Sequence, residues 1–254
     1  MSRHVLVIGA QRCGTTFLHA LLDAHPSIAM ARPARPEPKV FLSDELTAQG
    51  YNWYRENFFA HAPEGALLGE KSTSYIEDAN APERVLRMLG TAEIVVLLRD
   101  PVQRAVSNWR FSTDHRREER SLETALRENF TGSRSWDPAA TSVSPFAYLE
   151  RGRYSAYLEP WFAAFPSNMH VHFLEDLRDR DVALERLYGS LGVDPSFRPA
   201  DQGRVNESVE PAPALSAALV ARLRDYYSSS DQALSERLGR GLPWPTHSGQ
   251  GVAK

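Results

Sequence analysis

The fold of this chain is decided by its first apolar stretch and the turn after it: His4-Val5-Leu6-Val7-Ile8-Gly9-Ala10-Gln11-Arg12-Cys13-Gly14-Thr15-Thr16-Phe17-Leu18. An apolar run ends at Gly9, a polar turn follows, and apolar residues then recur at helical spacing. A strand, a glycine-containing turn and a helix in this order are typical of a phosphate-binding loop. In such a loop, backbone N–H groups and the positive end of a helix dipole face an anion. We therefore predict a phosphate-binding loop between a strand at His4–Gly9 and a helix at Thr15–Ala24.

This loop differs from the loop that binds ATP or GTP. That motif requires Gly-x-x-x-x-Gly-Lys-Ser/Thr, in which the lysine reaches the terminal phosphates. Gly9 and Gly14 have the required separation, but Thr15 stands where the lysine should be, and the cation lies inside the turn as Arg12. The loop therefore favours an anionic nucleotide other than a nucleoside triphosphate.

Length and composition restrict the class of protein. The 254 residues are enough for one large α/β domain, which we place at 1–246 and expect to be followed by a disordered tail at 247–254. A net charge of −3 argues against an overall electrostatic footprint for nucleic acid. The single cysteine, Cys13, excludes an internal disulfide and a cysteine-rich metal site, and it suits a reducing compartment.

Targeting signals are not recognisable in the sequence. Met1-Ser2-Arg3 leads directly into the first strand, without the basic and apolar regions of a secretion signal. No apolar stretch approaches the roughly 20 residues that a membrane-spanning helix needs. We therefore expect a cytoplasmic protein that does not act in a membrane.

Strand and helix patterns alternate along the chain. Such alternation predicts an α/β fold with a P-loop-like parallel sheet and helices on both faces. Strands are predicted at 4–9, 28–31, 66–70, 93–98 and 169–174, and helices at 15–24, 51–58, 82–89, 101–111, 121–129, 154–165, 181–191, 214–228 and 232–238. Two long connections, 32–49 and 131–144, interrupt the pattern, and connections of this length are usually functional or mobile.

A second group of candidate ligands follows the apolar run 93–98. Arg99 stands directly at the end of this run, at the carboxyl edge of the predicted sheet, where open α/β folds bind ligands. Ser107 lies about two turns into the helix that follows. If the turn folds back, Arg99 and Ser107 can bind one phosphate between them. A surface turn at Arg99-Asp100, with Ser107 as an ordinary helix residue, fits the same pattern.

Two further polar residues fall at the same predicted edge. Lys71 follows a short strand and precedes the hydroxyl-rich turn Ser72-Thr73-Ser74. Glu37 stands between two prolines, which hold its backbone extended and stiff. Taken singly, Lys71 also fits a solvated surface charge, and Glu37 fits a rigid surface loop.

Together, these segments resemble the sulfotransferases that use 3′-phosphoadenosine 5′-phosphosulfate (PAPS). They are most similar to the heparan sulfate sulfotransferases and their soluble bacterial relatives. The matching segments are Gln11-Arg12-Cys13-Gly14-Thr15-Thr16 (the 5′-phosphosulfate loop), Leu98-Arg99-Asp100-Pro101 through Ser107 (the 3′-phosphate motif), Glu70-Lys71-Ser72-Thr73-Ser74-Tyr75 and Glu37-Pro38-Lys39-Val40-Phe41.

The resemblance implies a role for each candidate residue. Glu37 would be the base that takes the acceptor's proton, and Lys71 and Arg12 would lie near the bridging oxygen and the sulfonate. The 5′-phosphate would be bound by Arg12, Cys13, Gly14, Thr15 and Thr16, and the 3′-phosphate by Arg99 and Ser107. Arg204 lies where the family closes over the nucleotide. Arg12 is a departure, because the family usually has lysine there. Arginine keeps the charge but cannot donate a proton to the leaving group.

We therefore predict a sulfotransferase that moves a sulfuryl group from PAPS, its co-substrate, to a hydroxyl or amine of a small-molecule or carbohydrate acceptor, without a metal. The eight His and one Cys have no ligand spacing. Two alternatives stay open, a P-loop nucleotide kinase and a non-catalytic nucleotide-binding module. The connection at 131–144, with Trp136 and Phe146 beside it, is predicted to be a lid over the acceptor pocket, although a surface excursion without a role fits it too.

Overall fold

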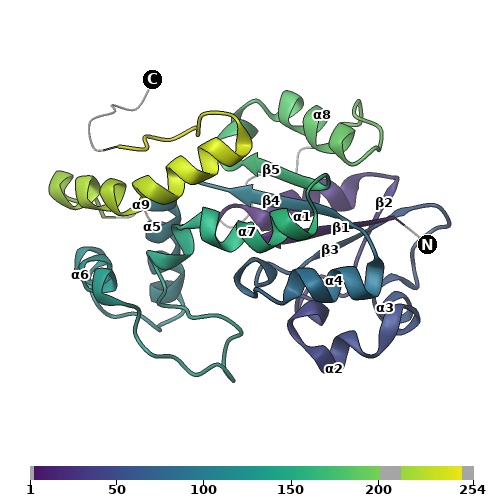
Figure 1. The fold of residues 1–254 in the computed structure, drawn as a ribbon, viewed down its shortest axis with the longest axis horizontal. Helices are drawn as coiled ribbons and strands as arrows, with labels where there is room; N and C mark the ends of the chain where they lie inside the picture. Colours follow the sequence, from purple (N-terminus) through teal and green to yellow (C-terminus); the bar gives the residue numbers. More distant parts are fainter. Residues whose placement is uncertain (1–2, 201–212, 248–254) are drawn as a thin grey trace. The chain divides into compact units, whose positions relative to one another are not determined.

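The computed structural model describes residues 3–200 and 213–247. Figure 1 draws the chain with its helices and strands labelled. The chain divides into two compact units. The first comprises Met1–Leu98 and Glu159–Glu207, and the second comprises Arg99–Leu158 and Ser208–Lys254. The single domain at 1–246 stays a prediction, and the predicted tail at 247–254 lies outside the described residues except for His247.

The first unit contains a five-stranded sheet in the order β2-β3-β1-β4-β5. All neighbouring strands are parallel, which confirms the predicted α/β fold. The strands are β1 (His4–Gly9), β2 (Ile28–Met30), β3 (Leu67–Lys71), β4 (Glu93–Leu98) and β5 (Met169–Phe173). Because all the strands run the same way, the segments after β1, β2 and β3 leave the sheet at one edge.

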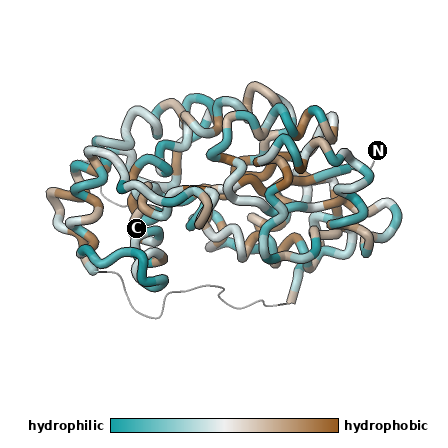
Figure 2. The backbone as a smooth tube through the Cα atoms, turned by 90° about the horizontal axis from the view of Figure 1, so that it is seen from below, coloured by the Kyte–Doolittle hydropathy of each residue, from teal (hydrophilic) through white to brown (hydrophobic). Residues whose placement is uncertain are grey.

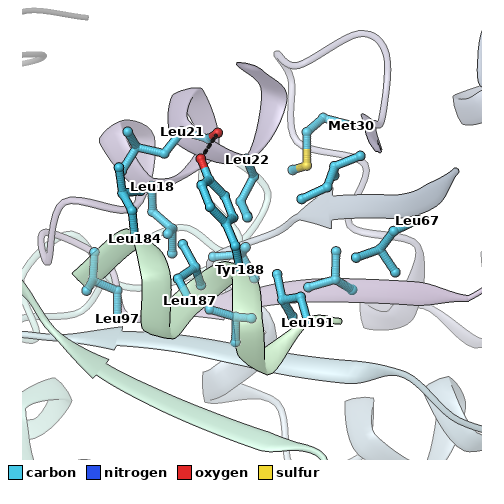
Figure 3. Close-up of a cluster of buried hydrophobic side chains, with 14 residues drawn as sticks. Leu18, Leu21, Leu22, Met30, Leu67, Leu97, Leu184, Leu187, Tyr188 and Leu191 are labelled. Carbon is cyan, nitrogen blue, oxygen red and sulfur yellow. Dashed lines mark hydrogen bonds between the residues drawn. The ribbon is translucent and has the colours of Figure 1, made fainter. Parts of the chain in front are cut away.

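One face of this sheet is covered by α1 (Thr15–Ala24) and α8 (Arg180–Ser190). Figure 3 shows the cluster of buried side chains between them and the strands, including Leu18, Leu22, Leu184 and Leu187. The hydroxyl of Tyr188 in α8 donates to the carbonyl of Leu21 in α1 at 2.8 Å. This bond satisfies a buried polar group and ties the two helices together.

The other face of the sheet is apolar as well. Leu6 and Ile8 alternate along β1 with Val5 and Val7, so they point to the opposite side, and all four are fully buried. Figure 1 shows α8 and α4 (Ala81–Leu89) on opposite sides of the strands. Figure 2, in which the tube is coloured by residue hydropathy, shows brown hydrophobic stretches in the interior of this unit. Helices on both faces agree with the prediction.

The connection predicted at 32–49 contains two short helices and ends just before α3 (Gly50–Phe59). These are η1 (Val40–Leu42) and α2 (Asp44–Thr47), and the Ser43 side chain caps α2 by accepting from Leu46 N at 3.2 Å. The prediction of one uninterrupted connection is therefore wrong. Val40 and Phe41 are fully buried, and this burial orders a segment whose proline and charge content indicated a loop.

The second unit is helical. Its core is formed by side chains of α5 (Pro101–Asp114), α6 (Leu122–Glu128) and α9 (Ala217–Leu238), together with Tyr148 and Leu149. This unit also contains the short helices η3 (Asn129–Thr131) and η4 (Glu150–Gly152). The short helices η2 (Tyr75–Glu77) and η5 (Leu174–Arg178) belong to the first unit. The boundary between the units at Leu158 falls inside α7 (Tyr154–Ala164).

The helices predicted at 214–228 and 232–238 are one helix, α9, so the predicted break is wrong. Serine and aspartate favour turns because their side chains compete for backbone groups. Here those side chains have other partners: Ser230 Oγ lies 3.1 Å from Ser155 Oγ, and Asp231 accepts from Trp244 Nε1 at 3.1 Å. Because tertiary contacts engage both side chains, the helix continues through them.

None of the helices in 3–200 and 213–247 combines the length and the apolar composition needed to cross a membrane. Over the same ranges, no three His, Cys, Asp or Glu side chains are grouped so that they could hold a metal ion.

Candidate active site

The loop predicted to bind phosphate begins where β1 ends and enters α1 at Thr15. Ala10 N–H donates to the Leu97 carbonyl of β4 at 2.9 Å, which fixes the start of the loop at the carboxyl edge of the sheet. Thr15 and Thr16 occupy the first turn of α1, where no preceding helical carbonyl can accept from their N–H groups. An anion at this point would meet those groups and the positive end of the helix dipole. The predicted strand, loop and helix are confirmed, and binding of an anion stays a prediction.

Two residues of this loop have a left-handed backbone. Arg12 has a φ of 69° and Gly14 a φ of 88°. The backbone angle at position 14 favours glycine, and a Cβ atom there would lie 2.8 Å from Leu174 Cδ1, so the end of that side chain would have to shift. Cys13 is fully buried, with its thiol 3.8 Å from the Gln11 carbonyl. Its thiol therefore packs inside the loop, and its backbone remains a candidate ligand.

Glu37 and Lys71 form an ion pair beside the end of β3. Lys71 Nζ lies 2.5 Å from Glu37 Oε1, and the two side chains are 9% and 17% exposed. Thr73 completes the environment of this carboxylate: its N–H donates to Glu37 Oε2 at 3.0 Å, and its hydroxyl lies 3.2 Å from each oxygen. The two residues predicted separately from the sequence therefore meet in space. A carboxylate and an ammonium group in contact, both partly accessible, can act as a base and as an electrostatic stabiliser.

The phosphate-binding loop is linked to the same turn. Gln11 Nε2 lies 3.4 Å from the Ser74 hydroxyl, which follows Lys71 by three residues. This hydrogen bond connects the loop after β1 with the turn after β3, in agreement with two parallel strands that end at one edge of the sheet.

His19 is a residue near this pair that the sequence analysis did not single out. It lies on α1 and is half-buried. Burial lowers the pKa of His19 below its ordinary value, and the positive charge of Lys71 lowers it further. The negative charge of Asp23 opposes this shift. The lowered pKa favours the neutral imidazole. The position of His19 in the sequence could have indicated it. His19 lies four positions after Thr15 and three after Thr16, and residues at these separations share one face of a helix.

Glu70 is the second residue without a role in the sequence analysis. Its carboxylate is fully buried in β3 and accepts from Tyr54 Oη at 2.5 Å, Tyr75 Oη at 2.5 Å and Ser72 Oγ at 2.7 Å. Burial raises the pKa of Glu70, and the three hydroxyl donors oppose that shift. The sequence signal was a charged residue inside an otherwise apolar strand.

In the second unit, the turn that carries Arg99 is held by two contacts. Arg224 of α9 donates to both carboxylate oxygens of Asp100, at 2.8 and 2.7 Å, and the Tyr154 hydroxyl donates to the Arg99 carbonyl at 2.8 Å. Asp100 is 8% exposed and also caps α5 by accepting from Val102 N at 2.9 Å. The alternative of a plain surface turn is therefore wrong for Asp100.

The side chains predicted to bind the 3′-phosphate are accessible. Arg99 and Ser107 are both half-buried, and Ser107 lies two turns into α5, as expected. Arg204, the remaining candidate, lies outside the described residues.

Comparison with known proteins identifies the family. Residues 2–193 match the sulfotransferase domain family. The chain belongs to this family. A mouse heparan sulfate glucosamine 3-O-sulfotransferase 3A1 is 26% identical over 264 residues, which cover 94% of this chain and 63% of that protein. A mouse bifunctional heparan sulfate N-deacetylase/N-sulfotransferase 4 is 31% identical over 204 residues, 76% of this chain and 22% of that protein.

Solved structures agree on the fold. A sulfotransferase from Alicyclobacillus acidocaldarius superposes with a TM-score of 0.74 at 22% identity, covering 95% of this chain and 98% of that one. A sulfotransferase domain from the curacin biosynthetic pathway has a TM-score of 0.54 at 15% identity, covering 96% of this chain and 99% of that chain. This sulfotransferase chain spans less than two thirds of the length of the curated mouse relatives named above.

Proposed function

We propose that this protein transfers a sulfuryl group from PAPS to a hydroxyl or amine of its acceptor. The observation that carries the proposal is the contact between Glu37 and Lys71, next to the turn that is hydrogen-bonded to the phosphate-binding loop. Sulfuryl transfer needs in-line positioning of the acceptor, removal of its proton and stabilisation of the leaving oxygen. By analogy with phosphoryl transfer, fixed charges can supply most of this catalysis.

In this mechanism, the acceptor displaces Lys71 from Oε1 of Glu37. Glu37 then takes the proton of the acceptor hydroxyl while the acceptor oxygen attacks the sulfur atom of PAPS. Lys71, released from the ion pair, stabilises the negative charge that develops on the bridging oxygen as the bond from sulfur to that oxygen breaks. Thr73 keeps two donors on the carboxylate while Lys71 moves.

The co-substrate is proposed to contact two sets of residues. Arg12, Cys13, Gly14, Thr15 and Thr16 would bind the 5′-phosphosulfate, in part through N–H groups of the first turn of α1. Arg99 and Ser107 would bind the 3′-phosphate, and Arg204 would add a further cation to the nucleotide. No metal is required by this arrangement, since its cations are side chains.

The acceptor is proposed to be a carbohydrate or another small molecule. The mouse relatives are named for heparan sulfate, one for 3-O-sulfation of glucosamine and one for N-sulfation. Both acceptor atoms, hydroxyl oxygen and amine nitrogen, therefore stay within the proposal. We further propose that the protein acts in the cytoplasm, without nucleic acid or membrane partners.

A P-loop nucleotide kinase is less well supported. Asp100 is the residue that could serve as its magnesium ligand, but both of its carboxylate oxygens accept from Arg224. Lysine is also missing from the position at which a kinase loop needs it, since Thr15 stands there.

Sulfur-35-labelled PAPS and a panel of acceptors test the proposal. The panel contains N-deacetylated and desulfated heparan oligosaccharides, phenols and aliphatic alcohols. We expect label in one acceptor class, together with an equal amount of 3′-phosphoadenosine 5′-phosphate. Binding of the nucleotide without transfer to any class would favour a non-catalytic module, and transfer of phosphate from labelled ATP would favour the kinase.

A further inference from the structure

Glu70 places a carboxylate in the buried interior of the first unit. Its side chain is fully buried, and burying a carboxylate is costly unless hydrogen bonds satisfy it. Three hydroxyl groups do so, those of Tyr54, Ser72 and Tyr75. An apolar side chain in β3 would fill the same place without that cost. The charge therefore needs an explanation beyond packing.

Two of the three hydroxyl groups also bind the segment that follows Glu37. Ser72 Oγ accepts from the Lys39 N–H at 2.9 Å, and Tyr75 Oη accepts from the Phe41 N–H at 3.2 Å. Each hydroxyl has one proton and two acceptor lone pairs. An ionised carboxylate can only accept. By taking both hydroxyl protons, the Glu70 carboxylate leaves the lone pairs of Ser72 and Tyr75 for the two backbone N–H groups.

The side chain of Arg84 fixes the same segment from α4. It donates to the Phe41 carbonyl at 3.3 Å and to both oxygens of Asp44, at 2.9 and 3.2 Å. The backbone of Phe41 is therefore held at its N–H by Tyr75 and at its carbonyl by Arg84. Lys39 has a left-handed φ of 55°, an uncommon conformation for a residue with a side chain, which the bond to Ser72 helps to hold.

The hydrogen bond from the Lys39 N–H to Ser72 holds the backbone two positions after Glu37. Only Pro38 separates Glu37 from Lys39, and proline has a restricted φ. From the end of β3 into the turn that follows, the residues alternate in role. Glu70 and Ser72 support the backbone beyond Glu37, whereas Lys71 and Thr73 contact the Glu37 carboxylate. One short segment thus holds both the backbone and the side chain of the same loop.

We propose that Glu70 is a positioning residue that sets the place of Glu37 through the hydroxyl groups of Ser72 and Tyr75. The proposal rests on the proposed function, in which Glu37 is the base. Small displacements of a catalytic group cost large factors in rate, so loss of this support should lower the catalytic constant. Nucleotide binding should be unaffected, since neither hydroxyl belongs to the phosphate-binding loop.

The test uses three variants that each remove one hydroxyl from Glu70. Ser72→Ala and Tyr75→Phe break the connection to the loop, whereas Tyr54→Phe is the matched control. The Tyr54 hydroxyl lies at the same 2.5 Å from Glu70 but binds no other group among the described residues. We expect kcat to fall roughly 10- to 100-fold in Ser72→Ala and Tyr75→Phe, with the Kd for 3′-phosphoadenosine 5′-phosphate unchanged. Tyr54→Phe should lower kcat much less, and thermal unfolding is followed for all three.

Double variants with Glu37→Gln separate positioning from general stabilisation of the fold. If Ser72 and Tyr75 act through Glu37, removing either hydroxyl should cost little further activity once Glu37→Gln is present. Additive losses, or equal losses in Tyr54→Phe and Tyr75→Phe, would overturn the positioning role. Normal turnover in the single variant Glu37→Gln would instead overturn the proposed base.

Discussion

Lys71 Nζ lies 2.5 Å from Oε1 of Glu37, although the two residues are 34 positions apart in the chain. The contact joins the end of β3 to the segment between β2 and η1. Both side chains are only partly exposed, so water screens the pair less than it would at the open surface. This pair brings the proposed base and the proposed stabilising cation together.

Replacing Glu37 by glutamine should lower turnover by about 100-fold or more, because the amide cannot take the acceptor's proton. The Kd for the nucleotide should not change. Transfer of labelled sulfate and calorimetry measure the two quantities. Glu64→Gln, at an exposed position, is the control for the loss of one charge. Turnover close to normal would contradict the role of Glu37, and His19 would then be the next base to test.

Lys71→Ala should lower kcat more than it weakens nucleotide binding, since the ammonium matters most when the leaving oxygen becomes negative. Lys71→Arg retains the charge and should keep more activity than Lys71→Ala. Steady-state kinetics with PAPS and calorimetry with the product nucleotide give the comparison. An effect of Lys71→Ala on Kd alone would mean that Lys71 serves binding and not the transfer step.

Arg99→Ala should raise the Kd for 3′-phosphoadenosine 5′-phosphate by roughly 10- to 100-fold. A hydrogen bond to a charged group contributes about 1.5–3 kcal/mol of binding free energy, and the variant loses it. Affinity for AMP, which has no 3′-phosphate, should stay the same and serves as the internal control. Titration calorimetry measures both ligands. If the unmodified protein binds both nucleotides equally well, Arg99 and Ser107 do not form a 3′-phosphate site.

Shortening the connection at 131–144 should raise the KM for the acceptor and leave nucleotide affinity intact. Trp136 in this segment is 39% exposed, and the Arg134 guanidinium lies 5.2 Å from the centre of the Phe146 ring. An exposed aromatic ring suits a contact with an acceptor. Trp136→Ala alone should give part of the same effect. Unchanged acceptor kinetics in both variants would show that the segment is only a connection.

Asp231→Asn should stabilise the protein above neutral pH. Burial raises the pKa of Asp231 to about 7, with the bond from Trp244 opposing the shift. A raised carboxyl pKa favours the folded state at low pH, and this contribution is lost as the pH rises from about 4 through 7. The shift corresponds to at most about 4 kcal/mol. Asparagine does not titrate, so the stability of the variant lacks this pH dependence. The difference in unfolding free energy between Asp231→Asn and the unmodified protein should therefore grow from about pH 4 to pH 7.

Urea unfolding at pH 4, 5, 6, 7 and 8, followed by tryptophan fluorescence, checks this expectation. Asp225→Asn is the matched control, because Asp225 is exposed on the same helix. A stability difference between Asp231→Asn and the unmodified protein that does not vary with pH would contradict the assignment.

The local elements of this fold could be predicted because their signals are local. The apolar run 4–9, the glycine at position 14 and the helical spacing after it lie within one short stretch, and all five predicted strands form. Local signals failed where tertiary contacts replaced them. Ser230 and Asp231 suggested a break in α9, but their side chains bind Ser155 and Trp244 instead of the helix backbone.

The amino-acid sequence alone was enough to predict the alternation of strands and helices, the loop between β1 and α1, and the motifs that place the chain among the sulfotransferases. Which polar groups meet could be seen only in the folded chain. Glu37 with Lys71, Glu70 with Tyr54, and Asp100 with Arg224 are pairs separated by 34, 16 and 124 positions. Their contacts depend on strand order, on register and on helix packing, which arise from the burial of the whole apolar surface and not from any one segment.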